Sequence, residues 1–292
     1  RLAGATLVAV AFIAPSFLMV LALSALYVRF GGLPWMRGAF YGIGAAVIAI
    51  IARSALKLTR MTLGRRTGLW LLWAVNLLVV VLTRSEIVWV FAASGFVTLL
   101  WHRSRSAAAS RLVVSVAPIW LLATIFGFFA KAGTVVFGSG LAIVPFLYGG
   151  VVERYHWLTE SQFLDAVAVS MITPGPVVIT VAFIGYLVAG PLGGIAAALG
   201  VFAPVYLIVV LAAPHYRRLT GNASVRAFVD GVTAAAAGAL AGAVIVLARR
   251  AIVDGTTVGV ALVTLLLPLV VRRASEPVLI VAAGIAGIAL SY

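Results

Sequence analysis

The segment Thr173-Pro174-Gly175-Pro176 interrupts an apolar stretch of the chain. Both prolines lack an N–H, and each turns the preceding residue away from helical geometry, so no continuous helix can pass through. Hydrocarbon leaves loose backbone groups unsatisfied, and such a break is therefore tolerated only against protein or a water-filled cavity. The half-helix that follows offers free amides and the positive end of its dipole to an anion. The residues that we expect to bind an anion here are Thr173, Gly175, Val177, Val178 and Thr180.

A second break is predicted at Phe137-Gly138-Ser139-Gly140. Paired glycines favour a kink or a loop, and Ser139 can cap the helix that follows. Two helix N-termini that converge near the bilayer midplane would suit a tetrahedral dianion. Gly138, Ser139 and Gly140 are therefore candidate anion-binding residues. The alternative is that these glycines only allow neighbouring helices to pack closely.

Three charged side chains lie in or beside apolar sequence. Lys131 is one of two lysines and lies about two turns before Gly138, or ~10 Å at 1.5 Å per residue, where it could neutralise the anion. Alternatively, its ammonium extends to the membrane interface. Asp165 and Asp230 are the acids closest to apolar sequence, and either could carry a coupling proton because burial favours the neutral carboxyl group. The alternative for each acid is an exposed position at a helix end.

The residue types exclude several other kinds of chemistry. The chain has no cysteine, which excludes disulfides, thiolate metal sites and iron–sulfur clusters. Its histidines, His102, His156 and His215, share no ligand spacing, so no metal site is expected. The sequence contains no catalytic triad motif and no phosphate-binding loop. We therefore expect neither an enzyme nor a cofactor.

Composition predicts an integral membrane protein. The chain is 64% hydrophobic and 10% charged, whereas soluble domains contain about 25% charged residues. Its net charge of +14 fits the positive-inside rule and anionic lipid headgroups, and it could also raise the local concentration of anions. The basic residues lie in short loops between spans, so nucleic-acid binding is not expected. The sequence begins at Arg1, and we expect the true N-terminus to lie upstream.

The apolar runs predict an all-α, polytopic protein. A full span needs about 20 residues, and the runs 140–152 and 177–189 are shorter and flank the two breaks. These two runs are predicted to be half-helices or re-entrant segments. A helix with a polar first half, capped by Thr159, is predicted at 159–172. The other predicted helices are at about 3–28, 38–58, 68–83, 87–101, 116–136, 192–213, 229–248, 256–271 and 277–291.

The chain contains an internal repeat. A shift of 189 residues aligns 4–60 with 193–249 without a gap, and the identities include the pairs Pro15/Pro204 and Gly42/Gly231. The stretch 112–190 has no partner within the chain, so the first repeat is expected to lack its opening part.

The charges of equivalent loops predict how the two repeats are oriented. The segment 57–66 is strongly basic, whereas its counterpart at 249–254 is diluted by Asp254. This alternation suggests inverted topology. The predicted organisation is the C-terminal part of a first repeat at 1–105, a basic inter-repeat loop at 106–114 and a second repeat at 115–292.

These motifs resemble the chromate ion transporter family. The resemblance rests on the break at Phe137–Gly140, on Val151–Leu158, on Thr173–Thr180 and on Phe228–Ala234, and it covers essentially the whole chain. It implies export of chromate, with sulfate as a structural analogue, driven by an ion gradient. One departure is that the first-repeat break of that family, of the type Phe-Gly-Gly-Pro, is absent from this chain.

The sequence thus predicts a transporter of a tetrahedral oxyanion, chromate or sulfate, in the inner (cytoplasmic) membrane. Its expected partners are that oxyanion, membrane lipid and a second copy of the chain in a homodimer. Two alternatives stay open. The first is a sulfate importer or exchanger, and the second is a membrane scaffold without transport activity, which has no need of paired helix breaks.

Overall fold

The regular structure of this chain is helical. The computed structural model describes residues 2–30, 33–64, 66–83, 94, 119–134, 140–173, 175–213, 222–271 and 275–290. Among these residues, four helical stretches are long and apolar enough to cross a membrane: Thr6–Phe30, Pro34–Leu63, Val177–Leu211 and Ala223–Arg249. The protein is an all-α, polytopic membrane protein, as the composition predicted.

The helices follow the predicted apolar runs closely. They are α1 (Leu2–Phe30), α2 (Pro34–Leu63), α3 (Thr67–Thr83), α5 (Ile119–Thr134), α6 (Val144–Tyr148), α7 (Glu160–Ile172), α8 (Thr180–Ala212), α10 (Ala223–Ala251), α11 (Gly255–Val270) and α12 (Glu276–Leu290). Two of them are longer than expected, because α2 continues through Lys57 and Arg60 and α10 already contains Arg226. Arginine and lysine are good helix formers, so a basic segment need not be a loop. The helix expected at 87–101 lies outside the described residues, apart from Ser94.

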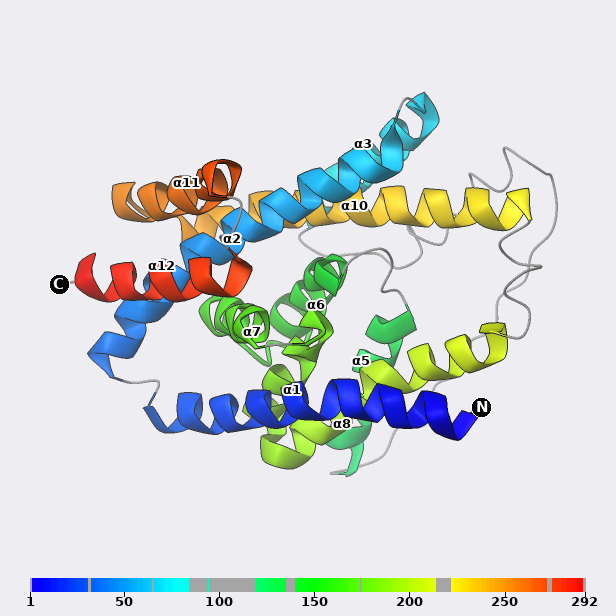
Figure 1. The fold of residues 1–292 in the computed structure, drawn as a ribbon, viewed down its shortest axis with the longest axis horizontal. Coiled ribbons are helices and arrows are strands. Elements are labelled where there is room, and N and C mark those ends of the chain that lie inside the picture. The colour runs from blue at the N-terminus through cyan, green and yellow to red at the C-terminus, as the bar shows by residue number, and fades with distance from the viewer. Residues whose placement is uncertain are drawn as a thin grey trace.

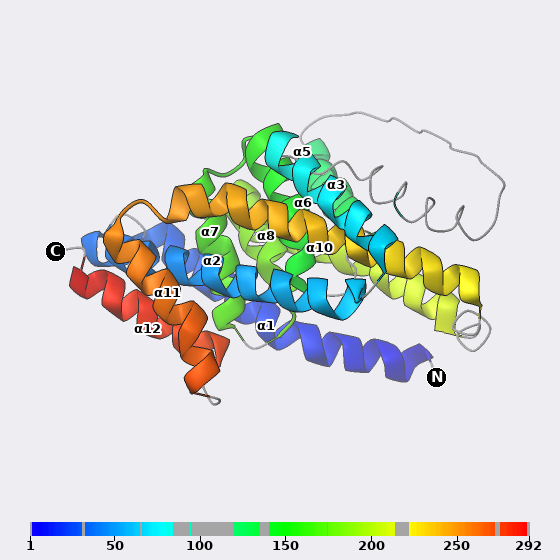
Figure 2. The ribbon, with the colours of Figure 1, turned by 90° about the horizontal axis from the view of Figure 1, so that it is seen from above.

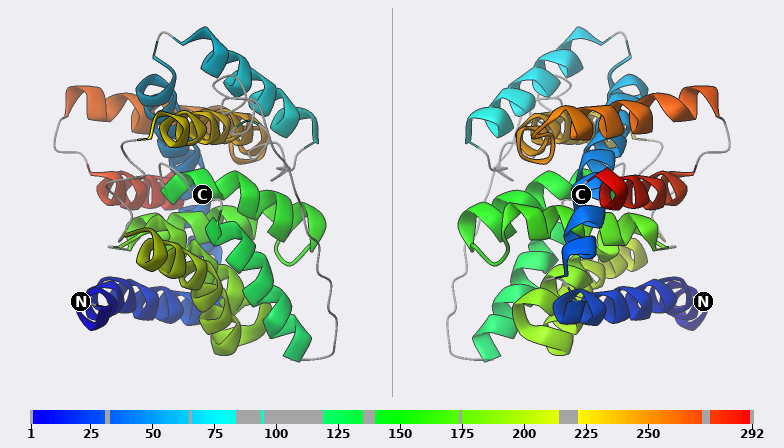
Figure 3. Two further views of the ribbon diagram at one scale, coloured as in Figure 1. Left: turned by 90° about the vertical axis from the view of Figure 1, so that its right-hand side faces the viewer. Right: turned by 90° about the vertical axis from the view of Figure 1, so that its left-hand side faces the viewer.

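The helices form two groups with α6 and α7 between them. Figures 1 and 3 show α1, α5 and α8 on one side of the molecule and α3, α10 and α11 on the other. Figure 2 shows α10 crossing the molecule beside α2 and α3. The helix pairs with the most extensive contact are α5–α8, α3–α10, α2–α12 and α2–α10. The largest buried side chains around the centre include Phe129, Phe163 and Phe183, each from a different helix.

The described residues show the first predicted break and the two ends that flank the second. Helix α7 ends at Ile172, and a short 3-10 turn, η3 (Val177–Ile179), then leads into α8. Helix α5 ends at Thr134, and the next described element is another 3-10 turn, η1 (Gly140–Ile143). Residues 135–139, with the candidates Gly138 and Ser139, lie outside the described residues. The break after Thr173 is caused by the proline chemistry on which the prediction rested.

The long helix α8 contains a sharp change of direction where two separate helices were predicted. Ala189 and Gly190 leave helical geometry, with φ −144° and ψ 29° at Ala189 and φ 62° and ψ −156° at Gly190. Glycine adopts a positive φ without the steric cost that a Cβ atom imposes. Pro191 follows directly and starts the second part with a φ suited to a helix.

Helix positions and directions support the internal repeat. The starts of α2 and α10, Pro34 and Ala223, are 189 positions apart, and the starts of α3 and α11, Thr67 and Gly255, are 188 apart. In Figures 1 and 2, α2 and α10 run in opposite directions along the molecule. Equivalent helices that run antiparallel are what an inverted repeat requires.

The packing between the two halves repeats with the same offsets. Helix α3 packs on α10, where a Cβ on Gly238 would lie 2.2 Å from the carbonyl oxygen of Trp73. The equivalent helices α11 and α2 also pack together, and there Ala49 and Ala261 belong to one buried cluster. By the offsets of 189 and 188, Ala49 corresponds to Gly238 and Ala261 to Trp73. Each half therefore covers the long central helix of the other half.

Two polar contacts obey the same relation. The Tyr41 hydroxyl donates a hydrogen bond to Asp254, and the Arg66 guanidinium pairs with Asp230. The offsets map Tyr41 onto Asp230 and Arg66 onto Asp254, so the two contacts are counterparts at opposite ends of the α2–α10 pair. The Thr257 amide and the Tyr41 hydroxyl hold the pKa of Asp254 below its usual value. The prediction of inverted repeats gains support from these contacts.

The close approach of α3 and α10 at Gly238 leads to a stability prediction. In Gly238→Ala the new Cβ meets backbone atoms of Trp73 rather than a flexible side chain, so the helices must separate. Overpacking of this kind costs about 1–3 kcal/mol. We expect Gly238→Ala to lower the unfolding temperature of the purified protein in detergent.

The matched control is Gly259→Ala on α11, where nothing lies within 4 Å of the added Cβ. This variant should be neutral or slightly stabilising because alanine favours helix. Equal melting temperatures for Gly238→Ala and Gly259→Ala would show that α3 does not pack against α10 as described.

Candidate functional site

The two predicted breaks meet in the structure. A Cβ atom on Gly140 would lie 3.3 Å from the Cβ of Val177, 3.8 Å from its amide nitrogen and 3.8 Å from a methyl group of Val178. The turns η1 and η3 are thus in direct contact. From Gly140 the chain continues through η1 and α6 into a π-helical turn at Gly149–Arg154, and from Val177 it continues into α8. Two helical segments therefore begin side by side.

The start of the η3–α8 segment offers free backbone donors. The first amides of a helix have no acceptor within that helix. Among the described residues, no hydrogen bond is found from the amides of Val177 or Val178. Both residues are partly exposed, as is Gly140. Within the described structure, these two amides could donate hydrogen bonds to an anion without giving up another hydrogen bond.

Buried hydroxyl groups lie directly behind this backbone. The Thr180 hydroxyl is within 2.6 Å of the Ser170 hydroxyl and within 2.7 Å of the Val177 carbonyl oxygen. The Thr173 hydroxyl donates to the Ser170 carbonyl at 3.0 Å. Thr173, Thr180 and Ser170 are all buried. They connect the end of α7 to the start of α8 across the break. The sequence analysis included the two threonines and missed Ser170.

Helix α1 contributes a fourth hydroxyl from far away in the sequence. Gly175 has a φ of +144°, and a Cβ there would lie 2.5 Å from the Ser16 Oγ. Ser16 is fully buried, and its hydroxyl donates to the Ile13 carbonyl at 3.0 Å. Sequence reasoning missed Ser16 because a serine inside an apolar helix resembles an ordinary back-bonded serine. The one sequence feature that could have pointed to Ser16 is its position directly after Pro15, in the N-terminal half of the chain.

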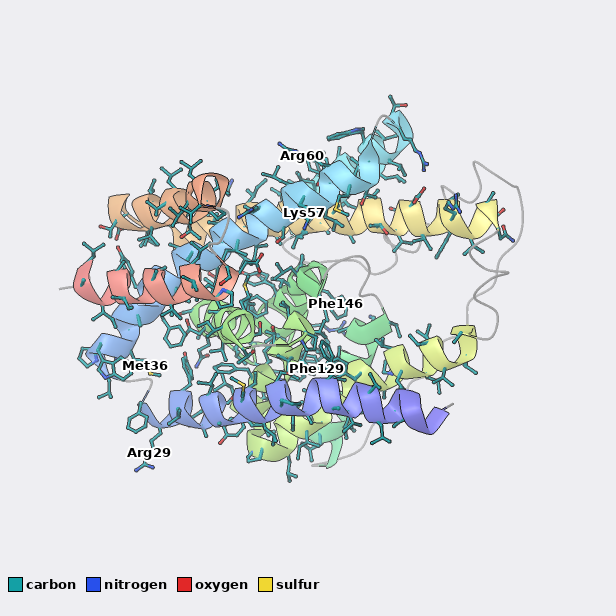
Figure 4. The ribbon with its side chains drawn as sticks, viewed as in Figure 1. Arg29, Met36, Lys57, Arg60, Phe129 and Phe146 are labelled. Carbon is teal, nitrogen blue, oxygen red and sulfur yellow. The ribbon has the colours of Figure 1, made fainter. Side chains whose placement is uncertain are left out.

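Local sequence explains how the two breaks are held in place. Helix α7 begins with a capping box in which Thr159 and Gln162 satisfy each other's backbone amides, which confirms the predicted cap. On the other side, the Phe128 ring stacks on Phe146 at 5.4 Å and meets Trp157 edge-on at 5.7 Å. Figure 4 shows Phe129 and Phe146 in the middle of the molecule. Aromatic packing of this kind fixes the re-entrant segment against α5.

The charged candidates lie in three different environments. Lys131 is exposed in the last turn of α5, and among the described residues its ammonium forms no ion pair. This position fits the alternative in which the side chain extends to the interface. Asp230 is also at the surface, where it pairs with Arg66 between α10 and the start of α3. Asp165 is buried, with 5% of its surface exposed.

Asp165 forms one contact of note. Its carboxylate accepts a hydrogen bond of 2.6 Å from the Tyr27 hydroxyl of α1. The Tyr27 ring packs edge-on against Phe40 and Phe183, so its position is fixed by three helices. Of the two acids suggested by the sequence, only Asp165 lies in the interior of the described structure near the break.

The sequence is similar to known proteins along nearly its full length. The profile of the chromate transporter family matches residues 1–99 and 123–288. A chromate transport protein of Cupriavidus metallidurans is 54% identical over 99% of this chain and 75% of its own length. A probable chromate transport protein of Synechococcus elongatus is 48% identical over 98% of the chain and 77% of its own, and a chromate transport protein of Pseudomonas aeruginosa is 30% identical over 97% and 74%. No solved structure matches the chain.

The family resemblance stated from the sequence is therefore confirmed, and these comparisons place the function of the chain in membrane transport. Its relatives are named for the transport of chromate, an anion with the charge and the tetrahedral shape that the converging helix starts would suit. This chain belongs to the chromate transporter family.

Proposed function

We propose that this protein exports chromate across the cytoplasmic membrane and that an ion gradient drives the export. The observation that carries the proposal is the meeting of Gly140 with Val177 and Val178, beside the buried hydroxyls of Ser16 and Thr180. A scaffold would not need this arrangement. Close helix packing alone does not explain this arrangement either. Small residues are enough for close packing, which needs neither amides without a partner nor buried hydroxyls.

The groups at the break match the needs of a tetrahedral dianion. An anion that leaves water loses its hydration, and only fixed donors can replace that hydration in a low-dielectric interior. The amides of Val177 and Val178 supply two donors, and the start of the η3–α8 segment adds a positive dipole end. The hydroxyls of Ser16, Ser170, Thr173 and Thr180 can rotate from carbonyl acceptors to the oxygen atoms of the anion.

Gly138, Ser139 and Lys131 complete the proposed set. The first two directly precede Gly140 in the sequence and lie outside the described residues. Lys131 acts at longer range in this proposal, because its exposed ammonium adds positive potential without touching the anion. Solvent screens an exposed charge, so its contribution is smaller than that of a buried donor.

Sulfate is the second candidate substrate. It shares the charge and the tetrahedral geometry of chromate, and every donor at the break could bind either anion. The homodimer and the bound lipid suggested by the sequence are also proposals. The outward direction rests on the family resemblance, and the coupling ion is assigned to a proton.

The inverted repeat belongs to the proposal as well. The antiparallel course of α2 and α10 and the paired contacts Tyr41–Asp254 and Arg66–Asp230 support it. In an inverted-repeat transporter the substrate site lies near the interface of the repeats, and one repeat moves relative to the other. Ser16 and Gly175 would then meet across that interface.

Ser16→Ala tests the anion site. If the Ser16 hydroxyl donates to the bound anion, its loss removes a hydrogen bond to a charged group, which contributes about 1.5–3 kcal/mol. The dissociation constant for chromate should then rise about 10-fold to 100-fold. The measurement is chromate binding to the purified protein, with sulfate as competitor.

Ser24→Ala is the matched control. Ser24 lies on the same helix, is equally buried and donates to the Val20 carbonyl at 2.7 Å, but it does not contact the break. We expect wild-type affinity for this variant. If both variants keep wild-type affinity, Ser16 does not bind the anion, and if both weaken equally, the effect comes from α1 packing.

Cysteine labelling tests the inverted topology, since the chain has no cysteine of its own. Thr67 and Val253 are exposed at equivalent ends of the two proposed repeats, Thr67 at the start of α3 and Val253 just before α11. In an inverted arrangement Thr67→Cys and Val253→Cys should react with a membrane-impermeant maleimide from opposite sides of oriented vesicles. Reaction of both cysteines from the same side would indicate parallel repeats.

A further inference from the structure

A polar pocket lies between α1, α2 and α7, apart from the break. Its volume is about 540 Å³. The exposed side chains of Arg37 and Ser161 contribute to its lining, and so does the buried carboxyl group of Asp165. The hydroxyls of Tyr27 and Tyr41 also face it. The pocket therefore offers a route from solvent to one buried carboxyl group.

The environment of Asp165 is unfavourable for an isolated negative charge. It accepts a hydrogen bond from the Tyr27 hydroxyl, and among the described residues no cation lies within ion-pair distance of it. A buried carboxylate without a paired cation is costly. A carboxyl group in this position therefore tends to bind a positive species from the pocket.

The other charged and titratable groups around Asp165 can be named element by element. Helix α2 contributes Arg37 and Tyr41, α1 contributes Tyr27, and α7 itself contributes Glu160. Helices α6, α8 and α12 and the π-helical turn at Gly149–Arg154, with Glu153 and Arg154, also pack on α7, but they add no charged side chain to the pocket lining. Of the two acids that line the pocket, Glu160 is partly buried and accepts a hydrogen bond from the Tyr148 hydroxyl at 2.9 Å, whereas Asp165 is buried.

The ligand set favours a proton over a metal ion. A metal cation needs several oxygen ligands, and the described residues contain no cluster of three or more carboxylate, histidine or cysteine side chains. The guanidinium of Arg37 in the same pocket would also repel a metal cation. A proton needs only one lone pair of a carboxylate oxygen.

Helix α1 links this pocket to the anion site. Ser16 and Tyr27 are 11 residues apart, about three helical turns, so both hydroxyls lie on the same face of α1. Ser16 meets Gly175 at the break, and Tyr27 meets Asp165 on α7. The two contacts join α1 to the α7–η3 segment at two points. A change at one contact therefore alters the fit at the other.

We propose that the pocket between α1, α2 and α7 is the proton site of the transporter and that Asp165 binds the coupling proton there, with Tyr27 as its positioning residue. The proposal rests on the proposed transport function and deepens it. The proton comes from water in the pocket, forms an O–H bond with a carboxylate oxygen of Asp165 and returns to water on release. Ionised Asp165 holds Tyr27 by a charge-assisted hydrogen bond, which is weaker once the carboxyl group is neutral.

The test separates chromate exchange from proton-driven transport in proteoliposomes. Chromate–chromate exchange at equal pH needs the anion site alone, whereas net chromate movement driven by a pH gradient also needs the proton site. We expect Asp165→Asn to keep exchange and to lose net movement driven by the pH gradient. Tyr27→Phe should keep both and shift the pH dependence of net movement.

Asp230→Asn is the matched control, because it removes an acid that lies outside the pocket in an exposed ion pair. It should keep both activities. Gradient-driven movement in Asp165→Asn at the wild-type rate would overturn the proposal. So would net movement that follows a sodium gradient at constant pH and disappears in Asp165→Asn.

Infrared spectroscopy tests the proton site without any transport. Lowering the pH should produce carbonyl bands of protonated carboxylic acids in the wild type, and the difference between the wild type and Asp165→Asn should contain the band component of Asp165. An unchanged band in that variant would overturn the assignment of the proton to Asp165. Absence of chromate exchange in the wild type would instead contradict the proposed function, while the infrared band would still decide the proton site.

Discussion

The structure depends on one constraint, which is that backbone polar groups inside a membrane must find partners within the protein. A helix satisfies this need internally, and the two breaks do not. At the Thr173 break the chain uses side-chain hydroxyls and contact with the other break to cover the exposed backbone. Within the described structure the amides of Val177 and Val178 remain without a hydrogen-bond partner, and the proposed anion site rests on these two donors.

The arrangement of the two halves explains why α1 is central to both proposed sites. Helix α1 comes from the N-terminal half of the chain and packs on α7 and α8 from the C-terminal half. Its single face brings Ser16 to the break and Tyr27 to Asp165. A movement of one half relative to the other would change both contacts together. Such a linkage is the physical requirement for coupling an anion to a proton, since each ligand must favour a different arrangement of the same interface.

Local chemistry was the most predictable part of this chain. Pro174 and Pro176 dictated the break, Thr159 dictated the start of α7, and Gly190 with Pro191 dictated the change of direction in α8. These predictions succeeded because each depends on a residue and its immediate neighbours. The meeting of Gly140 with Val177 was also expected, since both lie at predicted helix starts that would converge to bind an anion.

Long-range contacts were the part that sequence reasoning could not supply. Ser16 and Tyr27 sit in an apolar helix with no local sign that one would face Gly175 and the other Asp165. For Lys131 the sequence left two positions open, near the anion or at the membrane interface. The structure exposes its side chain, which fits the second. Which way a helix turns its polar residues depends on the helices around it, and one sequence does not contain that information.

The most direct test of the account is the location of the bound anion. Chromium scatters X-rays anomalously, so a crystal of the protein grown with chromate would show the anion as a single strong peak. The account predicts a peak within hydrogen-bond distance of the Val177 amide and the Thr180 hydroxyl, beside Ser16. A peak in the pocket beside Arg37, with none at the break, would contradict it.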